Sequence, residues 1–379
     1  MARSLTPLDI ARLRLSAQNI LGTERADPVD AVRAMTAMQG QDLPGTLWAI
    51  GLRARATQAD VREVFNRGHL VRSWPMRGTL HATTPDDLRL LLPLSRDRVV
   101  ASLAARHREL EISSDDVAAA ARAAVTALTS GPSALSRKDL LAVFERSGQI
   151  TAGQRGIHLA FMLAHLGLIC LGPFLGKEQG YVLFDEWAPA SGQSPSRDEA
   201  LATVALRYFT SHGPATVEDF AWWTKLTLTD ARAGAAAVRD ELAVLSVSGT
   251  EYLASPGIAE QAARPPGGRT VLLLPGFDEF ILGYTDRSAA LAPEHAQLIV
   301  PGNNGVFKPT IVIGGRVVGT WSRSDRANHI AVTAQVFRKL NPTETRGLTR
   351  ALNDYGRFRG MSVTLADVLR TPADGQPAR

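Results

Sequence analysis

In the first part of the chain, hydrophobic residues first follow a helical spacing and then the pattern of short β-strands. Apolar positions three and four residues apart predict helices. These helices cover residues 4–21, a segment that begins at residue 27, and residues 59–67. Thr6 and Pro7 form a typical start for the first helix, because a hydroxyl can cap it and proline fits its first turn. At residues 70–81 two short β-rich runs, broken by Pro75 and Gly78, indicate a hairpin.

This order of helices followed by a hairpin recurs later in the chain. In the second pass, helices begin at Ser136 and Gly153, and strands follow at residues 168–172 and 180–184. In the third pass, helices at residues 216–223 and 229–241 precede strands at 242–247 and 251–254. Helix, helix, hairpin is the order of a winged helix-turn-helix, a small unit that is usually packed against further copies or paired with a partner. The pattern therefore predicts three tandem winged-helix units in an α+β protein.

Linkers and a change of pattern divide the rest of the chain. Segments rich in proline, glycine and serine at residues 188–195 and 264–269 indicate linkers. After the second linker, strands spaced by glycine turns predict a small barrel or sandwich, over which a helix at residues 342–360 packs. We expect winged-helix units at 1–92, 131–190 and 196–260, connecting helices at 93–130, the β domain at 268–370 and a frayed tail at 371–379.

Composition places the chain among ordinary globular proteins. Hydrophobic residues make up 45% and charged residues 21% of its 379 positions. It has no apolar run of the ~18 residues that a membrane span needs, and its first residues lack the apolar stretch of a signal peptide. A single cysteine, Cys170, excludes an internal disulfide framework and a thiolate zinc cluster. We expect a cytoplasmic protein associated with the nucleoid.

The charge of the chain is compatible with a nucleic-acid partner. The formal net charge is +5 and the isoelectric point is about 9.6. Much of the positive charge is arginine, whose planar guanidinium matches phosphate oxygens. An arginine-rich composition spread evenly over the surface would give the same totals, so the positions of the charges must decide.

Gln39, Gly40 and Gln41 are the candidate catalytic segment. They follow a short amphipathic stretch and precede the basic hairpin at residues 70–81. Two glutamines one residue apart can occur by chance. Beside a basic hairpin, however, they suggest neutral hydrogen-bonding chemistry next to a phosphate backbone.

Basic residues on the predicted wings and turns are candidates for phosphate contacts. Taken singly, each is equally compatible with a solvated surface charge, and winged units also bind proteins. The candidates are Arg72, Arg77, Lys225, Lys308 and Arg323, and Arg232 lies near the third helix pair.

Other reactive residues do not form a recognisable site. Trp222 and Trp223 are more typical of a core than of a base-stacking platform. His158 and His165 have no carboxylate at metal spacing, so we predict no metal. Without a phosphate-cradling glycine-lysine loop we expect no ATP use and no cofactor. Asp278, which precedes Glu279 after a predicted strand, is either a site carboxylate or a residue that caps a turn or forms a salt bridge.

Several segments together resemble the AlkZ/YcaQ-type family of winged-helix DNA glycosylases over nearly the whole chain. They are the segments at residues 38–42, 70–81, 212–216, 219–223, 275–284 and 304–310. The resemblance implies a C-shaped clamp of winged-helix units with a β-barrel and DNA in a basic channel. It implies that Gln39 and Gln41 are catalytic, and Gln41 places the chain nearer the AlkZ-like branch, since YcaQ-like members carry aspartate there. Gly40 departs from the aliphatic residue of the family motif, which could leave room for a bulky adduct.

The resemblance predicts an enzyme that hydrolyses the N-glycosidic bond of N7-alkylguanine in double-stranded DNA. Such a base is already cationic, so amide oxygens that hold water and face the developing positive charge can suffice. No lysine nucleophile is required, which predicts a monofunctional glycosylase. AlkZ-type relatives suggest bulky natural-product adducts or interstrand crosslinks and antibiotic self-resistance as the setting. Three winged-helix units make a monomer sufficient to wrap DNA.

Two other functions remain open from the sequence. A non-catalytic winged-helix regulator would bind intact DNA with sequence preference and no lesion preference. A protein-interaction scaffold would bind DNA weakly even at low salt, whereas phosphate contacts give strong binding with a steep salt dependence.

Overall fold

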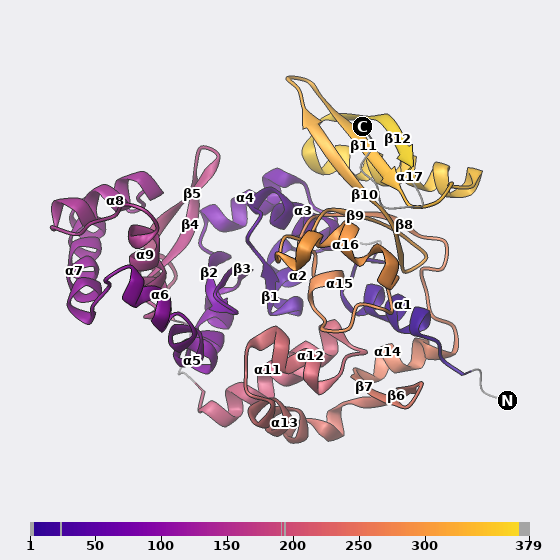
Figure 1. The fold of residues 1–379 in the computed structure, drawn as a ribbon, viewed down its shortest axis with the longest axis horizontal. Helices are drawn as coiled ribbons and strands as arrows, with labels where there is room; N and C mark the ends of the chain where they lie inside the picture. The colour runs from indigo at the N-terminus through magenta and orange to yellow at the C-terminus, as the bar shows by residue number, and fades with distance from the viewer. Residues whose placement is uncertain (1–3, 23–24, 191, 193–194, 371–379) are drawn as a thin grey trace.

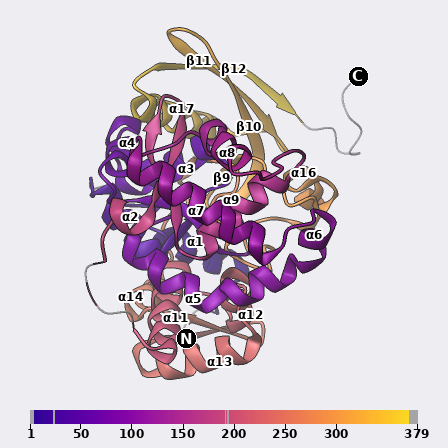
Figure 2. The ribbon, with the colours of Figure 1, turned by 90° about the vertical axis from the view of Figure 1, so that its left-hand side faces the viewer.

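The protein has an α+β fold, seen in a computed structural model that describes residues 4–22, 25–190, 192 and 195–370. Helices α7 to α9 lie at one side of the molecule, helices α11 to α13 at another, and the strands β8 to β12 with α17 at a third (Figure 1). The turned view keeps α11 to α13 and the sheet of β11 and β12 at opposite ends (Figure 2). Among the described residues, no helix is long and apolar enough to cross a membrane.

The N-terminal part carries the candidate catalytic segment. Thr6 caps α1 in a reciprocal pair of hydrogen bonds with Asp9, and Pro7 occupies the first turn, as the sequence pattern predicts. The elements are α1 (Pro7–Ala17), α2 (Pro28–Met35), β1 (Ala37–Gln39), α3 (Leu43–Ala54), α4 (Gln58–Asn66), β2 (Val71–Met76) and β3 (Thr79–Thr83). The predicted hairpin is therefore present, and β1 adds a third strand to it.

The next part shares a sheet with the first. Its elements are α5 (Pro85–Ser102), α6 (Ala104–Glu109), α7 (Ser114–Ser130), α8 (Arg137–Arg146), α9 (Arg155–His165), β4 (Ile169–Leu175), β5 (Glu178–Leu183) and α10 (Phe184–Trp187). Strand β2 pairs with β4, so two hairpins join in one sheet of order β1-β3-β2-β4-β5. The expected boundary between residues 92 and 93 lies inside α5, which continues through Pro93.

The third helix pair stands beside a hairpin of its own. The elements here are α11 (Arg197–His212), α12 (Val217–Thr224), α13 (Leu228–Ala237), β6 (Ala243–Val247), β7 (Thr250–Ala254) and α14 (Pro256–Glu260). Strands β6 and β7 pair only with each other in the described sheets. Short 3₁₀ turns occupy Arg239–Glu241, Gln261–Ala263, Pro293–His295 and Pro301–Asn303.

The C-terminal strands form an open sheet, so the expected β-barrel is wrong. The elements are β8 (Val271–Leu274), α15 (Glu279–Leu282), α16 (Ala296–Ile299), β9 (Thr310–Ile313), β10 (Arg316–Asp325), β11 (His329–Val336), α17 (Pro342–Arg359) and β12 (Ser362–Arg370). The strand order is β12-β11-β10-β9-β8, with β12 parallel to β11. Closure would require the two edge strands to pair. The expected tail at 371–379 lies outside the described residues.

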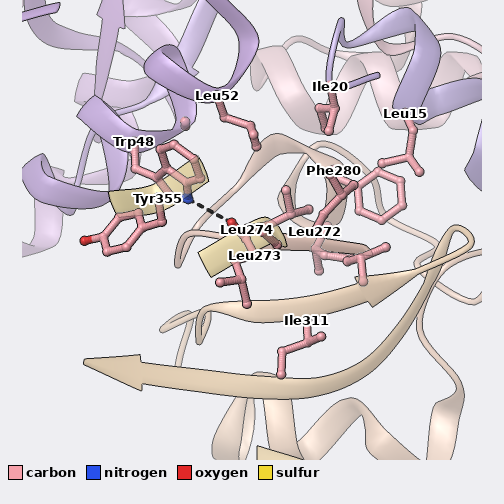
Figure 3. Close-up of a cluster of buried hydrophobic side chains, with 14 of the residues drawn as sticks. Leu15, Ile20, Trp48, Leu52, Leu272, Leu273, Leu274, Phe280, Ile311 and Tyr355 are labelled. Carbon is pink, nitrogen blue, oxygen red and sulfur yellow. Dashed lines mark hydrogen bonds between the residues drawn. The ribbon is translucent and has the colours of Figure 1, made fainter. Parts of the chain in front are cut away.

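The core explains why the sheet stays open. Trp48 of α3 packs edge-on against Tyr355 of α17, and the Trp48 indole N–H donates to the carbonyl of Leu273 on β8 at 2.8 Å (Figure 3). Leu272 and Leu274 are buried in the same cluster. Helices α3 and α17 therefore cover β8 and bury its apolar side chains. The apolar face of the sheet is buried against helices, so it does not have to be enclosed in a barrel.

Candidate active site

The candidate catalytic glutamines lie where a short edge strand runs into a helix. Gln39 ends β1 and stands opposite His81 of β3. The Gly40 N–H donates to the carbonyl of Leu80 at 2.6 Å, which continues the ladder by one residue. Asp42 then precedes the first turn of α3. The triplet is therefore held by sheet hydrogen bonds on one side and by a helix on the other.

Both amide side chains contact the start of β3. The Gln39 side chain is 7% exposed, and its Nε2 donates to the Thr79 hydroxyl at 3.3 Å. Its Oε1 accepts the N–H of Gly40 at 2.9 Å. Gln41 is exposed, and its Oε1 accepts the N–H of Leu80 at 3.3 Å. The structure thus brings the two amides to neighbouring residues of one strand.

The second carboxylate of the predicted acidic pair, Glu279, is buried and fixes the backbone of Gln39. Glu279 is 1% exposed, and its Oε1 accepts the N–H of Gln39 at 2.8 Å. Its Oε2 accepts the indole N–H of Trp223 at 3.1 Å and lies 3.6 Å from Nε2 of His212. Burial alone would raise the pKa of Glu279, but His212 and the charge of Arg77 outweigh it and hold the pKa below its ordinary value.

Asp278, the expected site carboxylate, forms a salt bridge with Arg53 and caps α15. Its two carboxylate oxygens accept hydrogen bonds from Nη1 and Nη2 of Arg53, both at 3.0 Å. The side chain of Asp278 is 1% exposed and that of Arg53 is 0% exposed. Oδ1 also caps α15 by accepting the N–H of Phe280 at 2.9 Å. The turn-cap and salt-bridge interpretation therefore describes its contacts. Adjacent residues point in different directions, so only Glu279 of the pair faces Gln39.

Arg72 is a buried cation beside Gly40. The residue is 9% exposed, and within the described chain its Nε and Nη1 atoms have no hydrogen-bond partner. Burial lowers the pKa of Arg72 to about 10, so the guanidinium stays charged at neutral pH. A Cβ added at Gly40 would lie 3.0 Å from Cδ of Arg72. The space that glycine leaves is therefore filled by the Arg72 side chain.

Arg77 is turned toward the interior. Its Nη1 donates to the carbonyl of Trp223 at 2.6 Å, and its Nη2 lies 2.9 Å from Nε2 of His81. Because Nδ1 of His81 lies 2.8 Å from the carbonyl of Thr79, this nitrogen carries the proton and Nε2 accepts from Arg77. Arg77 thus joins the hairpin to α12, and it is not free to reach a phosphate without breaking these contacts.

The other three basic candidates lie at the end of α12, before β9 and on β10. Lys225 is exposed at the C-terminal cap of α12, and Lys308 is exposed just before β9. Arg323 lies on β10, with Nε 3.3 Å from a carboxylate oxygen of Asp325. Among the described residues, none of the three makes a hydrogen bond to the side chain of Gln39 or Gln41.

The remaining sequence candidates take structural places. Trp223 is fully buried, as expected for a core residue, whereas Trp222 is half-buried with Arg77 5.0 Å and Arg287 5.7 Å from its ring. His158 contacts His107 at 3.2 Å, and Nδ1 of the buried His165 lies 3.0 Å from the carbonyl of Phe161. Over the described ranges, no three histidine, cysteine or acidic side chains are grouped to hold a metal.

Stability is expected to fall as the pH drops below about 6.5. Burial, together with Arg77, lowers the pKa of His81 from 6.5 to about 3, and burial lowers that of His165 to about 4. The unfolded chain binds protons that the folded chain excludes, so stability present above pH 6.5 is lost toward pH 4 and 3. Each histidine contributes a slope of about 1.4 kcal/mol per pH unit. Urea unfolding between pH 7 and 5 measures this slope.

A matched pair of variants assigns this slope. His165→Gln removes one of the buried titrating groups and should flatten the dependence, whereas His69→Gln at an exposed position serves as the control. An equal slope in wild type and His165→Gln would contradict the assignment to His165.

Comparisons with known proteins show which family and which fold this chain resembles. A family model described as "DNA glycosylase AlkZ-like" matches residues 32–358. A curated protein of Streptomyces sahachiroi, "Interstrand DNA cross-link repair glycosylase", is 27% identical over 318 residues, covering 78% of this chain and 82% of its own. The solved structure "Streptomyces sahachiroi DNA glycosylase AlkZ" has a TM-score of 0.80 at 24% identity, covering 97% of this chain and all of that one. At that identity, the structural likeness establishes the fold.

Proposed function

The chain belongs to the AlkZ-like family of DNA glycosylases, and from this premise we propose that it hydrolyses the N-glycosidic bond of N7-alkylguanine in double-stranded DNA. The family confirms the enzyme class that the sequence motifs predict. The proposal that this bond is hydrolysed by neutral amides rests on one observation. The side chains of Gln39 and Gln41 both form hydrogen bonds with the first residues of β3, Thr79 and Leu80. The description of a relative as an interstrand cross-link repair glycosylase supports bulky adducts or crosslinks as substrates.

The amides have separate roles in the proposed reaction. Gln41 is exposed, so its amide is placed to hold the attacking water. The Gln39 side chain is nearly buried and fixed at Thr79 and Gly40, so it presents a preorganised dipole to the positive charge that develops on the sugar. Glu279 is a positioning residue, because it holds the backbone N–H of Gln39.

Water breaks the bond between the sugar and the base in a single displacement. The base leaves as neutral N7-alkylguanine, because it carries its positive charge before the bond breaks. The water delivers oxygen to the sugar and its proton to solvent. Within the described chain, no lysine amine forms a hydrogen bond with Gln39 or Gln41, which supports a monofunctional enzyme that leaves an abasic site.

The fold supports the proposed way of holding DNA. We infer that three helix pairs with their hairpins act as winged-helix units around the duplex, as one clamp in a monomer. The pairs are α3 with α4, α8 with α9, and α12 with α13. Repair of natural-product adducts, and with it self-resistance to an antibiotic, is the setting that this proposal suggests.

Base release tests the proposed function directly. Two duplexes are incubated with the protein, one with a single N7-methylguanine and one with a bulky N7 adduct, and the free base is measured by mass spectrometry. We expect release of the base, an abasic site and no strand break. Tight binding to both duplexes without release would instead favour the non-catalytic DNA-binding protein. Weak binding even at low salt would favour the protein-interaction scaffold.

Arg72→Met is expected to weaken DNA binding without a change in sequence preference. Two guanidinium nitrogens of Arg72 have no hydrogen-bond partner in the described chain, but both are buried, so a contact with one phosphate requires the side chain to move outward. Its loss should make the slope of log affinity against log salt shallower by about 1. Fluorescence anisotropy with a labelled duplex at four salt concentrations measures this slope. Arg146→Met, an exposed substitution on α8, is the matched control, and an equal slope in wild type and Arg72→Met would contradict a phosphate contact.

A further inference from the structure

A recess of about 330 Å³ opens at the start of α3, where it is lined by Asp42, the residue that follows the triplet. One wall is the first turn of α3, with Asp42 and Gly45, and another is β10, with Ser322 and Arg323. Pro275 and Gly276 line it from the segment that leads into α15, the helix of Glu279. The volume is at the lower end of small-molecule sites, which span roughly 300–1,000 Å³. It is suited to one purine rather than to a large ligand.

The Asp42 carboxylate lines this recess, where the charge of Arg72 acts on it but no hydrogen bond from the described chain reaches it. Asp42 precedes α3, yet its side chain makes no capping hydrogen bond. In contrast, Asp27 and Asp278 both accept a backbone N–H at the start of their helices. A Cβ added at Gly45 would lie 2.5 Å from Oδ2 of Asp42, so the carboxylate occupies the space over this glycine. No donor to this carboxylate is found among the described residues.

The polar groups of the recess match one base in particular. A carboxylate accepts two N–H bonds and donates none, and guanine presents N1–H and the 2-amino group side by side. A guanidinium such as that of Arg323 donates to a carbonyl, and guanine carries O6 next to N1. Adenine offers an acceptor at N1, which a carboxylate would repel. The recess therefore has an acceptor and a donor in the arrangement that selects guanine.

We propose that, for lesions confined to one strand, this recess receives the displaced guanine, with Asp42 accepting N1–H and the 2-amino group and Arg323 donating to O6. The inference rests on the proposed glycosylase function and names the group that makes the enzyme specific for guanine. Asp42 directly follows Gln41, so a base seated on Asp42 has its glycosidic bond near the amides. Displacing a base from the stack costs a few kcal/mol, and hydrogen bonds to its Watson–Crick edge offset that cost.

A double-mutant cycle, in which both the protein and the lesion base are changed, tests the proposal. The substrates are duplexes with one N7-methylguanine or one N7-methylhypoxanthine, which keeps the cationic leaving group but lacks the 2-amino group. Wild type should release the second base about 10-fold more slowly, because the Asp42 carboxylate loses one of its two donors. In Asp42→Ala this difference should vanish, because the acceptor itself is gone. Single-turnover rates of base release are measured in all four combinations.

Two controls keep the outcomes separate. Asp198→Ala, at an exposed position on α11, should keep the wild-type difference between the two bases. Urea unfolding checks that Asp42→Ala is folded, and Asp42→Asn replaces it if it is not. Equal rates on both bases in wild type, or the same difference in wild type and the Asp42 variant, would overturn the guanine recess. No release of N7-methylguanine by wild type would instead overturn the proposed function itself.

Discussion

Gln39→Ala is expected to slow base release about 100- to 1,000-fold, the usual loss when one preorganised polar group at a developing charge is removed. The side chain is 7% exposed and fixed by Thr79 and Gly40, so water cannot simply take its place in the same geometry. The backbone N–H to Glu279 remains in the variant, which should preserve the fold. Single-turnover release of N7-methylguanine, with enzyme in excess over DNA, measures the chemical step.

The control variants separate catalysis from binding. Gln41→Ala should also lower the rate, and the double variant should lose less than the product of the two single losses, because the amides act on one reaction. Gln335→Ala, an exposed glutamine on β11, should keep the wild-type rate. DNA affinity should change little in Gln39→Ala. An unchanged rate in Gln39→Ala would exclude its amide from the reaction.

Asp278→Ala is expected to destabilise the protein by about 3–5 kcal/mol. Arg53 is fully buried, and the substitution removes the carboxylate that accepts both of its terminal nitrogens. Only the Gln18 amide oxygen at 2.7 Å and the Ala49 carbonyl at 3.2 Å would remain as acceptors for the charge. The free energy of unfolding from urea titration at pH 7 measures the loss.

The double variant Arg53→Met/Asp278→Leu distinguishes a stranded charge from a general packing defect. It removes the buried cation together with its partner, so it should recover a large part of the stability lost in Asp278→Ala. A loss below about 1 kcal/mol in Asp278→Ala would contradict the account of this pair, because that is the range of an exposed ion pair.

Local sequence pattern predicted the elements near the site better than their partners. The helix cap at Thr6, the hairpin that follows residue 70 and the buried Trp223 depend on neighbouring residues or on hydrophobicity, and all three are present. Glu279 contacts Gln39 across 240 positions, and no local spacing encodes that contact. The open C-terminal sheet also depends on distant contacts, since α3 and α17, which are far apart in the chain, pack together over β8 at the edge of the sheet.

The basic hairpin shows the limit of counting charges. Arg72 and Arg77 look alike in sequence, and both side chains lie largely inside the protein. Arg77 satisfies its donors on Trp223 and His81, whereas Arg72 keeps unpartnered nitrogens beside Gly40. Which arginine is free for a phosphate depends on the carbonyls that the folded chain brings to it.

The central claim is that neutral amides suffice because the departing base already carries a positive charge. Single-turnover base release from three duplexes tests it, since they differ only in one base: N7-methylguanine, guanine or hypoxanthine. We expect release of N7-methylguanine alone, with an intact strand and an abasic site. Release of the neutral hypoxanthine at a comparable rate would contradict the account, because it would require a group in the site to protonate the base.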